Sequence, residues 1–207
     1  MIRNETSYPT RVTFIFLLQL WRKTGSIEAG EYADEILSRV EAISMYHRDL
    51  KPFSNGYLVA LECWHTAAAA GYKGAADRAF RLVQIMEGKS GHELISDDQE
   101  DSEDDIEGTS PNKKIYPLMM KICAATKDEL DTPRSMAIAF DVLKRMEENN
   151  IKPGHKIFLF LYEAVQNYLR HHPGEEGNDL LREVFVSASR YGVKAPELKN
   201  RAGRDRV

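Results

Sequence analysis

The sequence predicts an all-α protein, an α-solenoid of four helix-turn-helix repeats with about eight helices in a right-handed superhelix. Three observations predict this fold. Prolines recur at Pro9, Pro52, Pro111 and Pro153, with gaps of 43, 59 and 42 residues. An aromatic residue follows each proline at one fixed distance, and a second apolar stripe follows each aromatic. Such a period is typical of helical repeat proteins, in which each hairpin buries its apolar face against the next.

The first helix of each repeat is indicated by three columns of residues, at offsets of 5, 9 and 12 from the proline. These offsets follow the i, i+4, i+7 rhythm of one helix face, so this face is expected to be buried in every unit. Trp21 and Trp64 share a column and are expected to belong to the core, not to a ligand site. The columns are Phe14, Tyr57, Tyr116 and Phe158; Leu18, Leu61, Met120 and Tyr162; and Trp21, Trp64, Cys123 and Val165.

A second helix is indicated in each repeat by a small residue with apolar residues four and seven positions later. The small residue allows the two helices of a hairpin to approach closely. Turn signals rich in Gly, Pro and Thr separate the paired helices. The pattern is clear in three units and looser in the fourth. The stripes are Ala33, Leu37 and Val40; Ala79, Val83 and Met86; Ala139, Leu143 and Met146; and Leu181, Phe185 and Ala188.

These columns divide the chain into one helical repeat domain with an insertion and a tail. The long gap between prolines is explained by an acidic insertion, which we expect to be disordered because carboxylates and glycines dominate it. The domain covers 8–196, with repeats at approximately 9–51, 52–88, 111–152 and 153–195, the acidic insertion at 89–110 and a basic C-terminal tail at 197–207.

The charge of the predicted repeats differs in sign from that of the whole chain. The formal net charge is −4, from 28 basic and 32 acidic residues. Nine of the acidic residues lie between Glu93 and Glu107, inside the insertion. Without them 23 acidic residues remain against 28 basic ones, a balance of +5. The repeats are therefore mildly basic.

Patterns typical of catalysis are lacking in the sequence, which contains no Gly-rich phosphate loop, nucleophile elbow or HExxH motif. Cys63 and Cys123 lie 60 residues apart and are expected to be reduced thiols in apolar helices. We therefore expect no enzyme, no cofactor, no metal site and no small-molecule substrate. No apolar run reaches the roughly 20 residues of a membrane span, so no membrane partner is expected. No targeting peptide is readable, which leaves the compartment open.

Three segments resemble the pentatricopeptide repeat family. The stretch 146–153, Met-Glu-Glu-Asn-Asn-Ile-Lys-Pro, is similar to the end of such a repeat, and 52–64 is similar to the start of the next first helix. The fourth unit ends at 191–195 with a related signature in which Ala195 replaces the proline. The resemblance covers about residues 8–196 and is closest to divergent members with a long period. Tetratricopeptide repeats fit the aromatic after the proline and the terminal Lys-Pro less well.

The resemblance implies binding of single-stranded RNA, often in mitochondria or chloroplasts, with one base read per repeat. In the family, bases are read by the residue after the first-helix aromatic and the residue after the repeat-ending proline. Here most residues of these two columns cannot hydrogen-bond a base edge through a side chain, which favours phosphate contacts over base reading. The columns are Ile15, Leu58, Pro117 and Leu159; and Thr10, Phe53, Asn112 and Gly154.

The expected function is a non-catalytic, RNA-associated adaptor in organellar RNA metabolism. The alternative is a protein–protein interaction scaffold, which the apolar columns and the short array favour. Basic and polar residues near the first-helix starts could line up along one surface for phosphates or for a partner protein. The same residues are equally consistent with solvated helix ends. This candidate surface comprises Arg11, Lys51, Asn55, Asn112, Lys113, Lys114, Lys152 and Lys156.

Overall fold

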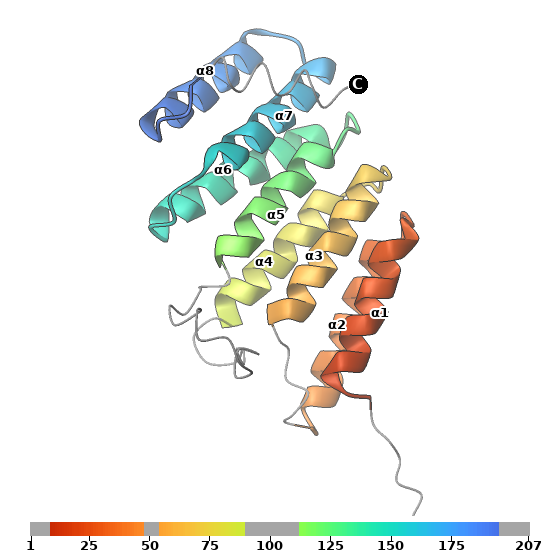
Figure 1. The fold of residues 1–207 in the computed structure, drawn as a ribbon. Coiled ribbons are helices and arrows are strands. Elements are labelled where there is room, and N and C mark those ends of the chain that lie inside the picture. Colours follow the sequence, from red (N-terminus) through yellow and green to blue (C-terminus); the bar gives the residue numbers. More distant parts are fainter. Residues whose placement is uncertain (1–8, 48–53, 90–111, 195–207) are drawn as a thin grey trace, which may run out of the picture.

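The computed structural model of the chain describes residues 9–47, 54–89 and 112–194. These residues form eight α-helices and no β-strand, in agreement with the predicted all-α class. Figure 1 shows the helices stacked side by side along the molecule, with α1 at one end and α8 at the other. The helices are α1 (Arg11–Thr24), α2 (Ala29–Ser44), α3 (Ser54–Ala69), α4 (Ala75–Lys89), α5 (Asn112–Ala125), α6 (Thr132–Glu148), α7 (His155–His171) and α8 (Glu175–Arg190).

The helices lie in two layers that follow the order of the chain. The odd-numbered helices pack on one another in sequence, α1 on α3, α3 on α5 and α5 on α7 (Figure 1). Each even-numbered helix packs on the odd-numbered helix of its own pair, and α2, α4 and α6 also pack on the odd-numbered helix that follows. Every pair therefore contacts its neighbours along the chain.

Local sequence signals explain where the first pair begins and turns. The hydroxyl of Thr10 accepts a hydrogen bond from the backbone N–H of Thr13, and the Thr13 hydroxyl accepts one from the backbone N–H of Thr10. This capping box satisfies donors that the first turn of α1 leaves free. Gly25 ends α1 in the left-handed conformation, with φ of 66°, which glycine adopts without strain.

The predicted first-helix columns form the core between the two layers. The aromatic column is buried in all four units, and so are Leu18, Leu61 and Met120 of the second column, whereas the predicted Tyr162 is only half-buried. Trp64 is fully buried, as predicted, whereas Trp21 is only half-buried and stacks on Tyr32 with ring centroids 3.8 Å apart. The core prediction is therefore confirmed for Trp64 and only in part for Trp21.

The second-helix stripes are buried as predicted in the first three pairs. Ala33, Ala79 and Ala139 have no exposed surface. In the fourth pair the buried positions are Gly177, Val184 and Ala188, while the predicted Leu181 and Phe185 are only half-buried. The small residue of this pair is thus Gly177, whose missing side chain leaves room for Leu169 of α7.

Hydrogen bonds join successive pairs at one recurring place. The hydroxyl of Tyr57 in α3 donates to Glu41 near the end of α2, at 2.7 Å. The hydroxyl of Tyr116 in α5 donates to Glu87 near the end of α4, also at 2.7 Å. The aromatic of the fourth unit, Phe158, has no hydroxyl.

At this last junction Tyr191, just after α8, supplies the missing hydroxyl. Its ring lies against Phe158 with centroids 5.6 Å apart. Its hydroxyl donates to Glu147 in α6 at 2.9 Å, which is the position of Glu41 and Glu87 in the earlier pairs. The predicted acidic insertion 89–110, apart from Lys89 at the end of α4, and the predicted basic tail 197–207 lie outside the described residues.

Candidate binding groove

A groove of about 990 Å³ runs across the layer of odd-numbered helices. Its lining comes from α1, α3, α5 and α7, one short set of residues from each helix. The contributing positions recur at offsets of about 3, 6, 7 and 10 from the proline that opens each unit. These offsets lie on the helix face beside the buried one, so sequential packing of the odd-numbered helices aligns them along one surface.

The walls of the groove are basic. Arg22 of α1 forms an ion pair with Glu62 of α3, so this arginine is largely neutralised. Lys114 and Lys121 of α5 and Lys156 of α7 are exposed and form no ion pair with any described residue. Their charges are therefore available to a bound anion.

A second hollow of about 400 Å³ continues the groove toward the carboxyl ends of α5 and α7, sharing Lys121, Leu159 and Phe160 with it. It adds exposed Lys127 and Arg170. Burial and then the nearby Lys121 lower the pKa of His65, so the positive charge here comes from lysine and arginine. Together the two hollows carry six basic side chains and two carboxylates.

The floor of the groove is apolar. Leu58, Pro117 and Leu159, three of the four residues that directly follow the first-helix aromatics, line the groove, while Ile15 does not. Leu118 and Phe160, which follow two of them in the sequence, are half-buried parts of the floor, and the buried Val59 completes it. None of these side chains donates or accepts a hydrogen bond, so the floor can offer only apolar and stacking contacts.

The structure brings together some of the predicted surface residues and separates others. Asn55, Lys114 and Lys156 line the groove, as the alignment of repeats predicts. Lys152 is exposed but lines a different hollow, between α5 and the start of α7, which Lys156 also borders. Arg11 is half-buried at the start of α1 and lines neither hollow.

The other three predicted surface residues have no described side chain. Lys51 lies outside the described residues. Asn112 and Lys113 begin α5, but only their backbone is described.

Four basic residues of the groove were missed in the sequence, namely Arg22, Lys121, Lys127 and Arg170. The prediction considered only the starts of the first helices. Lys121 is seven residues after Lys114, which places it on the same face two turns later. The helical period could therefore have identified Lys121, whereas Lys127 lies beyond the end of α5 and needed the fold.

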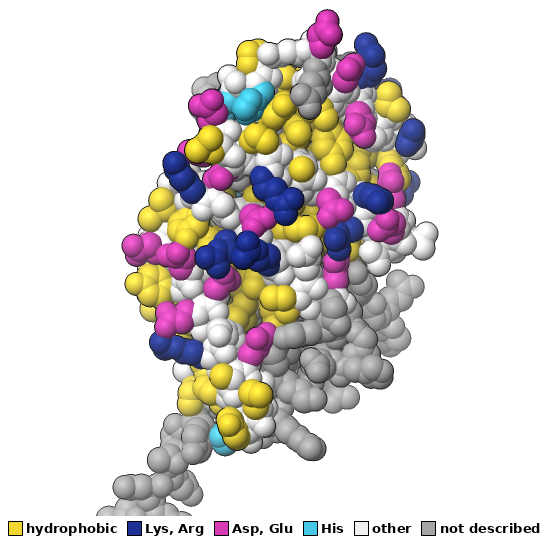
Figure 2. All heavy atoms as spheres, turned by 180° about the vertical axis from the view of Figure 1, so that it is seen from behind, with side chains coloured by type: hydrophobic (Ala, Val, Ile, Leu, Met, Phe, Trp, Pro, Cys, Tyr) yellow, Lys and Arg dark blue, Asp and Glu magenta, His cyan; other side chains and the backbone are white. Residues whose placement is uncertain are grey.

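The opposite face of the molecule has a different charge pattern. Figure 2 shows basic and acidic side chains interspersed there, with no field of one sign. Ion pairs of the even-numbered helices account for much of this mixture. Arg81 and Arg134 both contact Asp77 at 2.9 Å, and Arg145 contacts Asp141 at 3.0 Å. The unpaired lysines of the groove thus set the odd-helix layer apart.

The described residues give no sign of a reactive or metal-binding centre. Among them no group of three or more His, Cys, Asp or Glu side chains could hold a metal ion. Burial raises the pKa of both Cys63 and Cys123 to about 12, which keeps these thiols protonated and unreactive at neutral pH. Within 9–47, 54–89 and 112–194 no helix is long and apolar enough to cross a membrane.

Comparison with known proteins yields no match to a family model, to a curated protein or to a solved structure.

Proposed function

We propose that the chain is a short α-solenoid, a divergent relative of pentatricopeptide repeats, that binds single-stranded RNA in the groove without catalysing a reaction. The observation that carries this proposal is the set of three lysines, Lys114, Lys121 and Lys156, that line the groove without an ion-pair partner among the described residues. A row of unpaired cations over an elongated groove suits a phosphate backbone.

The apolar floor defines how the RNA would be held. Phe160 and Pro117 offer surfaces on which bases stack, because every base has a π-face. Leu58 and Leu159 offer no hydrogen bond to a base edge. The proposed role is therefore that of an adaptor that follows the RNA backbone, and by family resemblance it acts in organellar RNA metabolism.

A second candidate is a protein scaffold whose groove takes an acidic peptide with apolar side chains. The specific observation in its favour is the floor of Leu58, Leu118 and Leu159, which suits aliphatic side chains better than bases. The same lysines would then pair with carboxylates of the peptide. The two candidates use one surface, so one set of variants tests both.

Binding of fluorescent oligo-U to the wild type and to Lys114→Ala/Lys121→Ala/Lys156→Ala, at several salt concentrations, tests the proposal. Each phosphate neutralised on a single strand contributes about −0.7 to the slope of log affinity against log salt. Loss of three contacts should therefore make the slope shallower by about 2 and weaken binding strongly at low salt.

The matched control is Arg39→Ala/Arg81→Ala/Lys144→Ala, which removes the same charge from exposed residues of α2, α4 and α6. It should bind RNA nearly as the wild type does. If the wild type binds no RNA at low salt, the RNA proposal fails. Binding of an acidic amphipathic peptide that the groove variant loses would then support the scaffold.

A further inference from the structure

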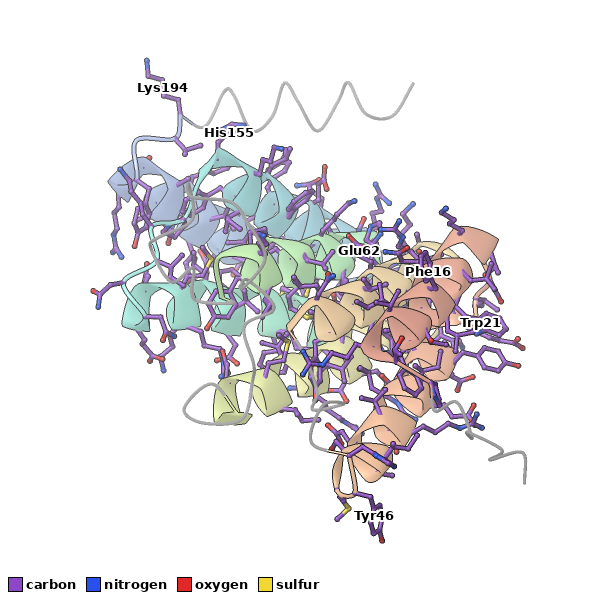
Figure 3. The ribbon with its side chains drawn as sticks, turned by 60° about the horizontal axis from the view of Figure 1, so that its bottom comes forward. Phe16, Trp21, Tyr46, Glu62, His155 and Lys194 are labelled. Carbon is purple, nitrogen blue, oxygen red and sulfur yellow. The ribbon has the colours of Figure 1, made fainter. Side chains whose placement is uncertain are left out.

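Helix α1 exposes a row of large apolar side chains at one end of the stack. Phe16 is 65 % exposed, Leu20 is 61 % exposed and Leu17 is 41 % exposed. Figure 3 shows Phe16 at this end of the molecule, far from Lys194 at the opposite end. Burial of such side chains is the main favourable term of protein association, so this row is a strong candidate for an interface.

The repeat columns show which contacts the equivalent face makes in the other repeats. Leu17 is eight residues after its proline, and its counterparts Ala60, Met119 and Leu161 are fully buried. Leu20 is eleven residues after the proline, and its counterpart Cys63 is buried with its thiol on the backbone oxygen of Leu18, at 3.4 Å. These columns therefore pack each odd-numbered helix on the preceding pair.

The opposite end of the stack carries the complementary face, on α8. Three residues of α2 form part of the surface on which α3 packs. Gly30 lies under the Trp64 ring, and Asp34 accepts a hydrogen bond from the Trp64 indole N–H at 2.9 Å. Leu37 is buried. We align α2 with α8 on their small residues, Ala33 and Gly177. The counterparts of Gly30, Asp34 and Leu37 are then Gly174, which directly precedes α8, and Asn178 and Leu181 of α8.

These three positions, at and just before the start of α8, are wholly or partly exposed to solvent. Gly174 and Asn178 are exposed and Leu181 is half-buried, although Gly30 and Leu37 are buried in α2. Asn178 and Leu181 line a shallow groove of about 710 Å³ together with Phe185 and Ser189. The α8 face thus has the form of a receiving surface that no described residue covers.

The α1 face and the α8 face also carry counterparts of the residues that form the Trp64 contact inside the chain. Trp21 is the counterpart of Trp64, and its indole N–H donates to no described residue. The Asn178 side-chain oxygen, at the position of Asp34, can accept such a hydrogen bond. Gly174, at the position of Gly30, leaves room for an indole ring.

We infer that two copies of this chain associate head to tail, with α1 of one copy packed on the α7–α8 end of the other. The contact repeats the arrangement in which α3 packs on α1 and α2 within one chain. It is heterologous, because different surfaces meet, and it leaves one free end on each side for further copies. The odd-numbered layer, and with it the basic groove, then continues from one copy into the next.

Sedimentation velocity and light scattering of the full chain over a wide range of concentration test this inference. The head variant is Phe16→Glu/Leu20→Glu and the tail variant is Asn178→Glu/Ser189→Glu, all at exposed positions that tolerate a charge. The mass of the wild type should rise with concentration. Each variant alone should stay at one copy, since its charged face blocks one side of every contact.

An equal mixture of the two variants gives the decisive result. The head variant keeps its α8 face and the tail variant keeps its α1 face, so the mixture should form a dimer and stop at two copies. The matched control Ile85→Glu/Leu130→Glu, at exposed apolar positions in the middle of the stack, should associate as the wild type does. Circular dichroism should show the same helix content in every variant.

Three results would overturn the inference. The wild type could stay at one copy at all concentrations, which would mean that the end faces do not meet. The tail variant alone could associate as strongly as the wild type, which would indicate two α1 faces in contact. The mixture could fail to form a dimer although the wild type associates, which would place the contact elsewhere.

Discussion

The backbone of Gly30 in α2 lies directly against the indole of Trp64 in α3. A Cβ atom placed on Gly30 would lie 2.3 Å from Cε3 of Trp64, far inside van der Waals contact. The ring cannot easily withdraw, because it is fully buried and its N–H donates to Asp34 at 2.9 Å. The first two pairs of helices therefore meet at a distance that only glycine permits.

Gly30→Ala is expected to destabilise the protein, although alanine is the better helix former by about 1 kcal/mol. The added methyl group forces the indole or the helix to move, and overpacking of this kind costs about 1–3 kcal/mol. Urea unfolding of the wild type and the variant measures the difference. In a Trp64→Leu background the same substitution should cost less, because the ring is gone. An increase in stability on Gly30→Ala alone would show that the pairs can separate without penalty.

Tyr116→Phe tests the hydrogen bond that joins the second and third pairs. The Tyr116 hydroxyl donates to Glu87 at 2.7 Å and accepts from the Asn149 amide at 3.2 Å. Loss of a hydrogen bond to a charged group costs about 1.5–3 kcal/mol, and partial exposure of Glu87 favours the lower end. Thermal unfolding should show the loss. Tyr191→Phe, whose hydroxyl contacts Glu147 near solvent, should cost less.

The same tyrosine predicts a dependence of stability on alkaline pH. Burial, and then the hydrogen bond to Glu87, raise the pKa of Tyr116 above its ordinary value of 10.0. The protonated hydroxyl stabilises the folded state, so this contribution is complete below pH 10.0 and is lost as the pH rises through the folded pKa. The difference in unfolding free energy between the wild type and Tyr116→Phe should therefore shrink above that pH. A difference that grows with pH would contradict the assignment.

Asn167→Leu is expected to be among the most damaging substitutions in α7. The side chain is buried, and its amide donates to the backbone oxygens of Ala124 and Thr126 at 2.8 and 3.0 Å. These carbonyls lie at the end of α5, where the helix itself leaves acceptors without donors. Each buried acceptor left unsatisfied costs about 1–3 kcal/mol. Chemical denaturation measures the loss, and Gln166→Leu, one residue earlier and half-buried, is the control.

Prediction from the sequence succeeded where one residue type recurs at a fixed spacing. Phe14, Tyr57, Tyr116 and Phe158 are buried as expected, because a periodic apolar face must be covered in every unit. The stripe of α8 was placed on Leu181, Phe185 and Ala188, of which only Ala188 is fully buried, and Val184 is fully buried although it was not predicted. Among the described residues no further pair packs on α8, so the apolar pattern relaxes and its register becomes ambiguous.

The groove was harder to predict than the core. Its lysines do not recur in every unit, so no column of the sequence marks them. At the position of Lys121, for example, the other three units carry Gln19, Glu62 and Glu163. Asn167 gave no signal at all, since a buried amide is recognised only through its partners on another helix. Trp21 was assigned to the core because it shares a repeat column with Trp64. Whether a column is covered depends on the neighbouring pair, which the pattern alone does not supply.

Weak discrimination between bases is the last prediction, and it follows from the floor of the groove. Leu58, Pro117 and Leu159 line the floor, and their side chains have no hydrogen-bonding group. A good bidentate contact to a base contributes about 1–3 kcal/mol of discrimination, and the floor can form none. Affinities for oligo-U, oligo-A and oligo-C at one salt concentration should therefore agree within about tenfold, which corresponds to about 1.4 kcal/mol.

Removal of the stacking surface separates the contribution of base stacking from that of the phosphate contacts. Phe160→Ala should weaken binding of all three oligomers, because stacking on an aromatic ring contributes about 1–3 kcal/mol per base whatever the base. It should leave the salt dependence unchanged, since no charge is removed. The lysine triple variant should do the reverse and flatten the salt dependence for every oligomer. A preference for one oligomer that persists at high salt would show that side chains outside the described groove read the bases.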